Sequence, residues 1–248
     1  MSPSARASTG PTPAPGCSCV PVIPDSVEAL IVDFDGTLAD TTASHELALR
    51  EALQPYGIDL DHRWYRDHVG LSIRELLTVL PGAALLPHEE IIRHSRIRLL
   101  AGVHAITPIA CVVSLVHVAR RAGLPCAVAS GASRVLVGPG LEALGLAGEF
   151  AAVVAREDVA HGKPAPDLFA EAARRLGVAP RVCLAVDDAP EGVASARAAG
   201  MRVLTVIDNH LAVLEDGAEA AANGGISQHR HDQQSPPHDG TRPPDQGA

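Results

Sequence analysis

Short apolar runs alternate with helix-like segments through the middle of this 248-residue chain, and this alternation restricts the fold more than any other feature. The runs occupy residues 29–32, 127–129, 151–154, 182–186 and 203–206. The runs are apolar at consecutive positions, with Thr205 as an exception, as expected of parallel strands covered on both faces. Several runs follow a helical pattern that ends in arginine and then glycine, the usual chemistry of a helix C-terminus. The pattern predicts an α/β fold with a Rossmann-like parallel sheet and helices on both faces.

A long insertion separates the first predicted strand from the second. Residues 33–126 lie between them, far more chain than an ordinary crossover needs. Helical patterns within it, at residues 44–56, 73–80 and 87–101, indicate a small inserted α-helical domain. We expect Pro108 to begin the helix that leads back to the sheet. The expected boundaries are residues 41–107 for the inserted domain and residues 25–40 and 108–215 for the core.

Both ends of the chain have a composition that does not favour a packed core. Residues 1–24 are rich in proline, serine and alanine, and residues 220–248 are rich in glutamine, histidine and proline. We expect a disordered leader and a disordered tail there. Solvated segments are favoured over metal sites, since few potential ligands lie together. These ligands are Cys17, Cys19, His229, His231 and His238.

The charge balance and the residue usage argue against several classes of partner. A net charge of −9 and an aromatic content of 2% disfavour nucleic acid or an anionic membrane as partner. No apolar run reaches the roughly 20 residues that span a bilayer, and no signal peptide is expected. Five cysteines at scattered positions argue against a disulfide framework and favour a reducing cytoplasm. A monomer and a homodimer both fit the sequence.

Polar residues follow three of the predicted strands, and a lysine follows a fourth. Asp33, Ser130 and Asp187 stand directly after their strands, and Lys163 lies in the loop after residues 151–154. The carboxyl ends of parallel strands meet at one edge of a sheet, where ligands bind in this class of fold. We therefore expect four segments that are distant in the sequence to converge on one site.

Two pairs of carboxylates in these segments indicate a cation. Asp33 and Asp35 can face a common point, and Gly36, the residue after Asp35, permits a sharp turn of the backbone. Asp187 and Asp188 are adjacent, and their charges repel each other unless a cation lies between or beside them. The sequence therefore predicts a cation close to the carboxyl edge of the sheet.

The other two segments offer groups that bind phosphate. A serine hydroxyl at Ser130 and the backbone N–H groups of Gly131 and Ala132 can donate to phosphate oxygens. Lys163 is the single lysine among 20 basic residues, so this position carries a compact ammonium where the rest of the chain uses arginine. Pro164 biases Lys163 toward an extended backbone, which helps to fix the place of the ammonium.

These four segments, in this order, resemble the four motifs of the haloacid dehalogenase superfamily. They read Asp-Phe-Asp-Gly-Thr-Leu, Ser-Gly-Ala-Ser, Gly-Lys-Pro-Ala-Pro-Asp and Asp-Asp-Ala-Pro-Glu-Gly-Val. The last two resemble the β-phosphoglucomutase-like branch, in which a small helical cap is inserted after the first strand. The resemblance covers residues 27–207 and implies that residues 41–107 form such a cap.

The resemblance implies magnesium-dependent phosphoryl transfer. Asp33 would attack phosphorus and form an aspartyl phosphate, while Asp35 would act as general acid and then as general base. Ser130 and Lys163 would neutralise the charge of the phosphoryl oxygens. The implied Mg²⁺ site comprises Asp33, the main-chain carbonyl of Asp35, and Asp188, with Asp187 beside it.

The resemblance also implies substrate-binding residues in the cap. Residues 40–45 resemble the stretch at the cap entrance, and residues 69–75 resemble the cap loop that contacts substrate. Arg74 is either the ligand of a second anionic group or a solvated helix residue. The full set implied for substrate is Thr41, His45, Gly70, Arg74, Gly131 and Ala132.

The absence of lysine from the cap distinguishes among the reactions of the superfamily. A β-phosphoglucomutase would place a lysine where Val69 stands, and a phosphonoacetaldehyde hydrolase needs a cap lysine for a Schiff base. We therefore expect a phosphatase that acts on a small phosphorylated metabolite such as a sugar phosphate. Two alternatives stay open: a phosphomutase in which His68 or Arg66 replaces the lysine, and a non-catalytic module that binds a phospho-metabolite.

Overall fold

A computed structural model describes residues 23–69 and 71–213 of the chain. Its main sheet has the strand order β5-β4-β1-β6-β7-β8, in which every neighbouring pair is parallel except β7 and β8. The strands are β1 (Ala29–Val32), β4 (Cys126–Ala129), β5 (Ala152–Val154), β6 (Cys183–Val186), β7 (Arg202–Ile207) and β8 (His210–Val213). The α/β fold class is thereby confirmed. The antiparallel strand β8 was not predicted from the sequence.

The register of the central strands brings the ends of three motifs together. Strand β1 pairs in parallel with β4 on one side and with β6 on the other, and Val32 is opposite both Val128 and Val186. All residues of these three strands are buried. Because parallel strands end at the same edge, the residues that follow β1, β4 and β6 lie at one edge of the sheet.

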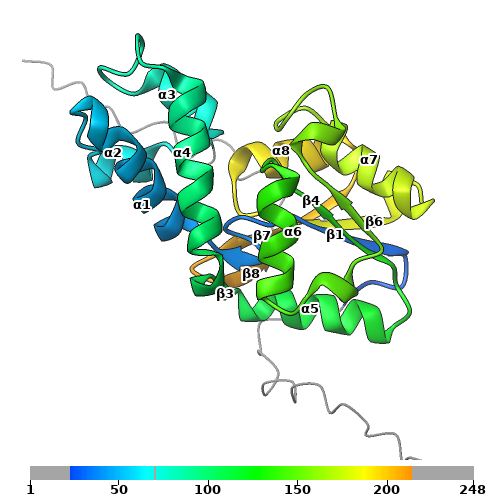
Figure 1. The fold of residues 1–248 in the computed structure, drawn as a ribbon. Helices are drawn as coiled ribbons and strands as arrows, with labels where there is room; N and C mark the ends of the chain where they lie inside the picture. Colours follow the sequence, from blue (N-terminus) through cyan, green and yellow to red (C-terminus); the bar gives the residue numbers. More distant parts are fainter. Residues whose placement is uncertain (1–22, 70, 214–248) are drawn as a thin grey trace, which may run out of the picture. The chain divides into compact units, whose positions relative to one another are not determined.

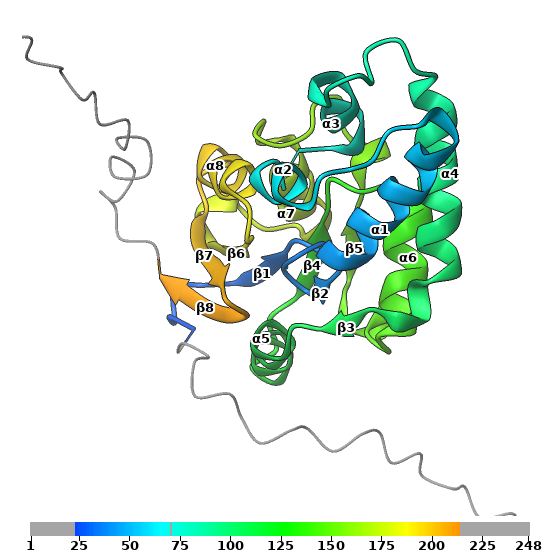
Figure 2. The same ribbon diagram turned by 90° about the vertical axis from the view of Figure 1, so that its left-hand side faces the viewer.

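Helices cover both faces of the sheet, and the side chains of β1 alternate between the two cores. Leu30 and Val32 belong to the same hydrophobic core as residues of α5 and α6, whereas Ala29 and Ile31 belong to the core that includes residues of α7 and α8. Figures 1 and 2 show these helices around the sheet. Their bounds are α5 (Ala110–Arg121), α6 (Arg134–Ala143), α7 (Asp167–Leu176) and α8 (Pro190–Ala198).

A separate group of helices lies between β1 and β4 in the sequence and has a hydrophobic core of its own. That core includes Leu53, Leu77 and Ile91, all fully buried, and Figure 1 shows the group beside the sheet, in colours from blue to teal-green. The helices are α1 (Thr42–Leu53), α2 (His62–Asp67), α3 (Ile73–Val79) and α4 (His88–Ala101). The inserted segment is thus helical, as predicted, and it contains one further helix, α2, that was not predicted. The domain boundaries stay a prediction.

The chain leaves and re-enters the core through a short antiparallel pair, β2 (Ala39–Asp40) and β3 (Thr107–Pro108). The prediction that Pro108 begins a helix is wrong, because Pro108 pairs with Ala39 and α5 begins only at Ala110. The N–H of Ile109 donates to the carbonyl of Leu38 at 3.0 Å, which keeps this segment extended until it has passed the first motif.

Short 3₁₀ turns connect several of these elements: η1 (Gln54–Tyr56), η2 (Val103–Ala105), η3 (Ala147–Glu149), η4 (Arg156–Asp158) and η5 (Pro180–Val182). The predictions for the cysteines of the leader and the histidines of the tail lie outside the described residues. Within residues 23–69 and 71–213, no helix is both long enough and apolar enough to cross a bilayer.

Candidate active site

Lys163 joins two of the motifs directly. Asp33 follows β1, its side chain is buried, and its N–H donates to the carbonyl of Val186 on β6 at 2.9 Å. The Nζ of Lys163 donates to Oδ1 of Asp33 and to Oδ2 of Asp187, at 2.5 Å in each case. The predicted convergence of Asp33, Lys163 and Asp187 at one edge of the sheet is therefore observed.

The electrostatics of this cluster depend on the lysine. Burial raises the pKa of Asp33, the charge of Asp187 acts in the same direction, and only the charge of Lys163 lowers it. Burial alone would lower the pKa of Lys163, but the charges of Asp187 and Asp33 raise it above its usual value. The ammonium is therefore charged at neutral pH, and it offsets the repulsion among the buried carboxylates.

Three carboxylates at this edge can hold a metal ion. One oxygen from each of Asp33, Asp187 and Asp188 lies within 4.8 Å of the others. Burial raises the pKa of Asp188, and the neighbouring charge of Asp187 raises it further. A cation would relieve this repulsion, and the all-oxygen donor set fits a hard ion such as Mg²⁺.

Two glycines let these carboxylates pack closely. A Cβ on Gly192 of α8 would lie 2.0 Å from the carboxylate atoms of Asp187. A Cβ on Gly36 would lie 2.4 Å from Oδ2 of Asp188, and Gly36 also has a φ of +77°, which favours glycine. Both positions therefore require glycine, because any side chain would collide with a carboxylate of the site.

Thr37 is a residue of the site to which sequence reasoning assigned no role. Its side chain is fully buried. Its Oγ1 donates to Oδ1 of Asp188 at 2.7 Å and accepts from the N–H of Asp188 at 3.0 Å. Thr37 stands directly after Asp-Phe-Asp-Gly in the sequence, but its role follows only from its contacts with Asp188, which lies 151 residues further along the chain.

The carboxylate of Asp35 turns toward the inserted helices. Its Oδ1 accepts from Oγ1 of Thr41 at 2.9 Å and contacts Nε2 of His45 at 3.1 Å. Burial acts to raise the pKa of Asp35, but the charge and hydrogen bond of His45 and the Thr41 hydroxyl lower it below its usual value. Burial acts to lower the pKa of His45, and Asp35 raises it. The structure thus brings Thr41 and His45, predicted for substrate, to the proposed acid–base residue.

Ser130 lies in a tight turn after β4. Its side chain is fully buried, and its N–H donates to the carbonyl of Val154 at 2.9 Å. The Oγ of Ser130 accepts from the N–H of Ala132 at 3.0 Å, so the hydroxyl hydrogen can still be donated to a ligand while that amide is used within the turn. Gly131 is exposed, with open space where a side chain would begin.

The other cap residues predicted for substrate have different placements. Arg74 of α3 pairs with Glu89 of α4, with 2.5 Å between Nη1 and Oε1, and both side chains are mostly exposed. Gly70 lies outside the described residues. The ring of His68 stacks on Trp64 with 4.1 Å between centroids, and its Nδ1 donates to the Trp64 carbonyl. Within the described part of the chain, Thr41 and His45 are thus the two cap residues predicted for substrate that contact a motif acid.

Known proteins with this arrangement include phosphatases. Fructose-1-phosphate phosphatase YqaB from Escherichia coli K12 is 38% identical over 186 residues, which span 71% of this chain and 95% of the relative. The crystal structure of CbbY from Rhodobacter sphaeroides in complex with phosphate matches with a TM-score of 0.66 and 30% identity, covering 73% of this chain and 86% of that chain.

A second crystal structure of CbbY from Rhodobacter sphaeroides, a variant in complex with xylulose-(1,5)bisphosphate, matches with a TM-score of 0.66 and 29% identity. It covers 73% of this chain and 86% of that chain. The model of the haloacid dehalogenase-like hydrolase family matches residues 27–200, which include every motif described above. On the combined grounds of fold, site and family match, this chain belongs to the haloacid dehalogenase-like hydrolases.

Proposed function

We propose that this hydrolase is a magnesium-dependent phosphatase that acts on a small phosphorylated metabolite through an aspartyl phosphate. The observation that carries the proposal is the ammonium of Lys163, held 2.5 Å from both Asp33 and Asp187 at the carboxyl edge of the sheet. A carboxylate nucleophile needs such a cation, because otherwise its own charge repels the phosphate dianion.

Each residue has a distinct role in the proposed reaction. Asp33 attacks phosphorus, and Lys163 and the Ser130 hydroxyl bind the phosphoryl oxygens. Asp33, Asp187 and Asp188, with the Asp35 carbonyl, would hold Mg²⁺, which adds positive charge to offset that of the phosphoryl group. Lys163 is charged in the resting site, because the charges of Asp187 and Asp33 raise its pKa.

Asp35 is proposed to move the proton. Because the pKa of Asp35 is lowered and that of His45 is raised, the proton of the resting pair is held by His45 and is passed through the Asp35 carboxylate to the leaving oxygen. Asp35 later accepts a proton from the attacking water. Thr41 and His45 hold its carboxylate from the first turns of α1, so the inserted helices set its orientation. These two residues thereby serve the reaction through Asp35, in addition to any contact with substrate.

The relatives support sugar phosphates as the substrate class. One relative carries the name fructose-1-phosphate phosphatase, and another has been crystallised with a sugar bisphosphate. A phosphomutase would need a cation in place of the lysine missing at Val69. His68 is engaged with Trp64 by stacking and by its Nδ1, so the phosphomutase alternative would depend on Arg66, an exposed residue of α2.

The proposed location is a reducing cytoplasm. Cys111, Cys126 and Cys183 are buried free thiols in the described part of the chain. Burial raises the pKa of Cys126 and of Cys183 to about 11, so both remain protonated and unreactive at neutral pH. Whether the protein is a monomer or a homodimer stays a prediction.

A phosphate-release assay on the full chain tests the proposal. With Mg²⁺ present, we expect release from an aryl phosphate and from one or more hexose or pentose phosphates, and no release after EDTA. Asp33→Asn should lower kcat/KM by at least about 10³-fold. Asp59→Asn, at an exposed position of the cap, is the matched control. Magnesium-dependent release that persists in Asp33→Asn would contradict the nucleophile assignment, and interconversion of hexose phosphates would identify a mutase.

A further inference from the structure

The two loops that carry the proposed phosphate-binding groups are joined outside the carboxylate cluster. Residues 130–133 follow β4, and residues 155–167 follow β5 and include Lys163. The N–H of Arg156 donates to the carbonyl of Ala132 at 3.0 Å. Two further hydrogen bonds, from Ser133 at the end of the first loop and from Arg134 at the start of α6, end on one carboxylate, that of Glu157. A single side chain therefore supplies much of the connection between the loops.

Glu157 takes over a capping role from the residue that would ordinarily perform it. Ser133 is the N-cap residue of α6, with an extended backbone at φ −69° and ψ 143°, but its side chain caps no N–H of its own helix. Its hydroxyl donates to Oε1 of Glu157 instead. The Oε2 of Glu157 accepts from the N–H of Arg134 at 3.0 Å, a favourable place for a negative charge. Glu157 thus holds both the end of the turn and the start of the helix.

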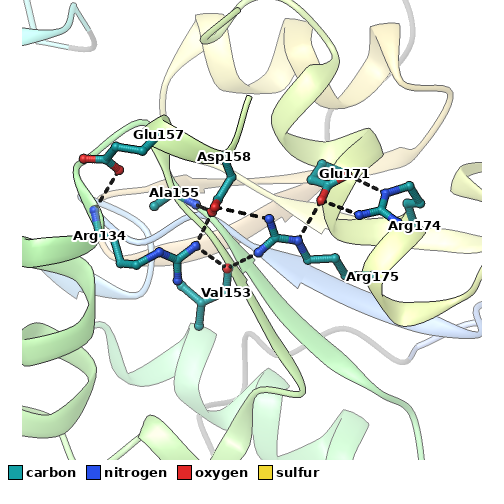
Figure 3. Close-up of polar contacts among 8 residues, drawn as sticks. All are labelled: Arg134, Val153, Ala155, Glu157, Asp158, Glu171, Arg174 and Arg175. Carbon is teal, nitrogen blue, oxygen red and sulfur yellow. Dashed lines mark hydrogen bonds and ion pairs between the residues drawn. The ribbon is translucent and has the colours of Figure 1, made fainter. Parts of the chain in front are cut away.

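The neighbouring carboxylate anchors Glu157 to the rest of the core. Asp158 pairs with Arg134 of α6 and with Arg175 of α7, at 3.2 Å for the latter. Both guanidinium groups also donate to the carbonyl of Val153 on β5, at 3.2 Å and 2.9 Å. Figure 3 shows the two arginines converging on Asp158 while Glu157 points toward the backbone of Arg134. The η4 turn is therefore fixed, and Glu157 extends from it to the Ser133 side.

The other half of the Lys163 loop is fixed independently. The Oγ of Ser195, a fully buried residue of α8, donates to the carbonyl of Ala165 at 2.5 Å. Lys163 therefore lies between an anchor on α8 and the η4 turn. Removal of the Glu157 contacts would leave the lysine loop attached to α8 but would loosen its connection to the Ser130 turn.

We propose that Glu157 is a positioning residue for phosphate binding: it fixes the Ser130–Ala132 turn relative to the loop that delivers Lys163. The inference rests on the proposed function, because it concerns the same phosphoryl site. Glu157 makes no contact with the reacting groups. Its effect is on the distance and orientation between the Ser130 hydroxyl and the Lys163 ammonium, both of which must reach one phosphoryl group.

Glu157 could also influence phosphate binding through the cap, and the experiment has to distinguish this influence from the positioning of the Ser130–Ala132 turn. Burial acts to raise the pKa of Glu157, whereas the Ser133 hydroxyl and the Arg134 N–H lower it below its usual value, and the charge of Arg96 on the cap helix α4 adds to the lowering. The cap is thus within electrostatic range of Glu157. Arg96→Ala removes this influence and leaves the hydrogen bonds between the loops intact.

The experiment measures binding of inorganic phosphate to the full chain in the presence of Mg²⁺, by calorimetry and as product inhibition. Glu157→Ala is expected to weaken phosphate binding by about tenfold, in the range seen when a supporting contact of a site is removed. Glu157→Gln keeps one carbonyl oxygen that can accept from the N–H of Arg134, and its amide N–H can donate to the Ser133 hydroxyl oxygen. Binding should therefore recover to within about threefold of the wild type. With an aryl phosphate, the loss in Glu157→Ala should appear mainly in KM.

Glu171→Ala is the matched control, since Glu171 pairs with Arg175, which also pairs with Asp158, but Glu171 does not contact the Ser130 turn. It should lower the melting temperature about as much as Glu157→Ala without changing phosphate affinity. If Glu157→Ala does not fold, Glu157→Asp, with a shorter reach to Ser133, should fold and bind phosphate more weakly.

Three outcomes would overturn the proposal in distinguishable ways. Wild-type phosphate affinity in folded Glu157→Ala or Glu157→Asp would remove the positioning role alone. An equal loss of affinity in Arg96→Ala or Glu171→Ala would assign the effect to the cap or to general stability. Failure of the wild-type protein to bind phosphate with Mg²⁺ would overturn the proposed function, and the positioning role with it.

Discussion

Asp33 and Asp35 stand two residues apart, yet the core holds one and the inserted helices hold the other. On the core side, Asp33 is only 4% exposed and contacts a lysine that also binds Asp187. On the cap side, the Asp35 side chain is 28% exposed and its partners are Thr41 and His45. Burial raises the pKa of Asp33, whereas His45 and Thr41 outweigh burial and lower that of Asp35.

The difference separates two tasks. The core side is fixed by the backbone of adjacent parallel strands, and it packs Asp187 and Asp188 against glycines at which a Cβ would collide with their carboxylates. The cap side depends on two side chains near the start of one helix. The nucleophile thus belongs to the rigid part, and the proton carrier follows the position of α1.

The largest expected effect comes from removing the cation of the core side. Lys163→Met should lower kcat/KM by about 10³-fold or more, because the charge that offsets Asp33 and the phosphate is lost. Lys163→Arg should restore only a part, since a planar guanidinium does not replace a compact ammonium between two acids. Steady-state phosphate release measures both variants. Activity above a tenth of the wild type in Lys163→Met would show that catalysis does not need the ammonium that contacts Asp33.

The cap side is tested by His45→Ala, with an expected loss in kcat of about 10–100-fold and little change in phosphate binding. Without His45, the pKa of Asp35 rises, because an attraction that lowers it is gone. The limb of the pH–rate profile that reports Asp35 should therefore move to higher pH. His62→Ala is the control, since His62 of α2 contacts Glu46 within the cap. An unshifted profile in His45→Ala would show that His45 does not act through Asp35.

Packing behind the motif provides the third test. A Cβ on Gly140 of α6 would lie 2.4 Å from the ring of Phe34, whereas a Cβ on Gly138 of the same helix would meet nothing within 4 Å. Gly140→Ala should lower the free energy of unfolding by about 2 kcal/mol and reduce activity, because Phe34 separates Asp33 from Asp35. Gly138→Ala should change it by less than about 1 kcal/mol, because the gain from alanine in a helix is offset by the restriction that Pro139 places on a preceding residue with a Cβ. Chemical denaturation measures the free energy of unfolding of both variants. Equal changes in the two would contradict the tight packing of Phe34 against Gly140.

The smallest effect is expected at the ion pairs of Glu171 with Arg174 and Arg175, which contact neither carboxylate of the first motif. Hydrogen bonds from Arg174 and Arg175 lower the pKa of Glu171 to about 2. A lowered pKa stabilises the fold above the usual value of about 4.5, and this contribution disappears as the pH falls toward 2. Glu171→Gln should cost about 1 kcal/mol at pH 7, since the arginines are partly exposed, and nothing near pH 2. Denaturation at several pH values measures this, and a cost that does not vary with pH would exclude the ionic origin.

Most of the sheet could be predicted because consecutive apolar residues are a strong signal for buried parallel strands. The strand β8 was missed, although Asp208 and Asn209 both have positive φ and form the tight turn that such a hairpin requires. The helix α2 was missed because it is short, although Asp61 caps it by accepting from the N–H of Trp64. Both local signals were present but covered too few residues.

The candidate site could be predicted only in part, for a physical reason. The convergence of Asp33, Lys163 and Asp187 follows from strand order and from residues that stand directly after strands. The contacts of Asp35 with His45, and of Phe34 with Gly140, depend on how a helix docks against a loop. Periodicity and spacing do not determine such docking, so these contacts became visible only in three dimensions.

The arginines on the Val153 carbonyl also bear on how this protein behaves at high concentration. Strand β5 is an edge of the sheet, and its outward carbonyl is a place where a strand from another molecule could pair. Arg134 and Arg175 occupy that acceptor and put two charged groups along the edge. Sheet growth between molecules is thereby blocked at this edge, so replacing both arginines by uncharged residues should increase aggregation even where folding and catalysis are preserved.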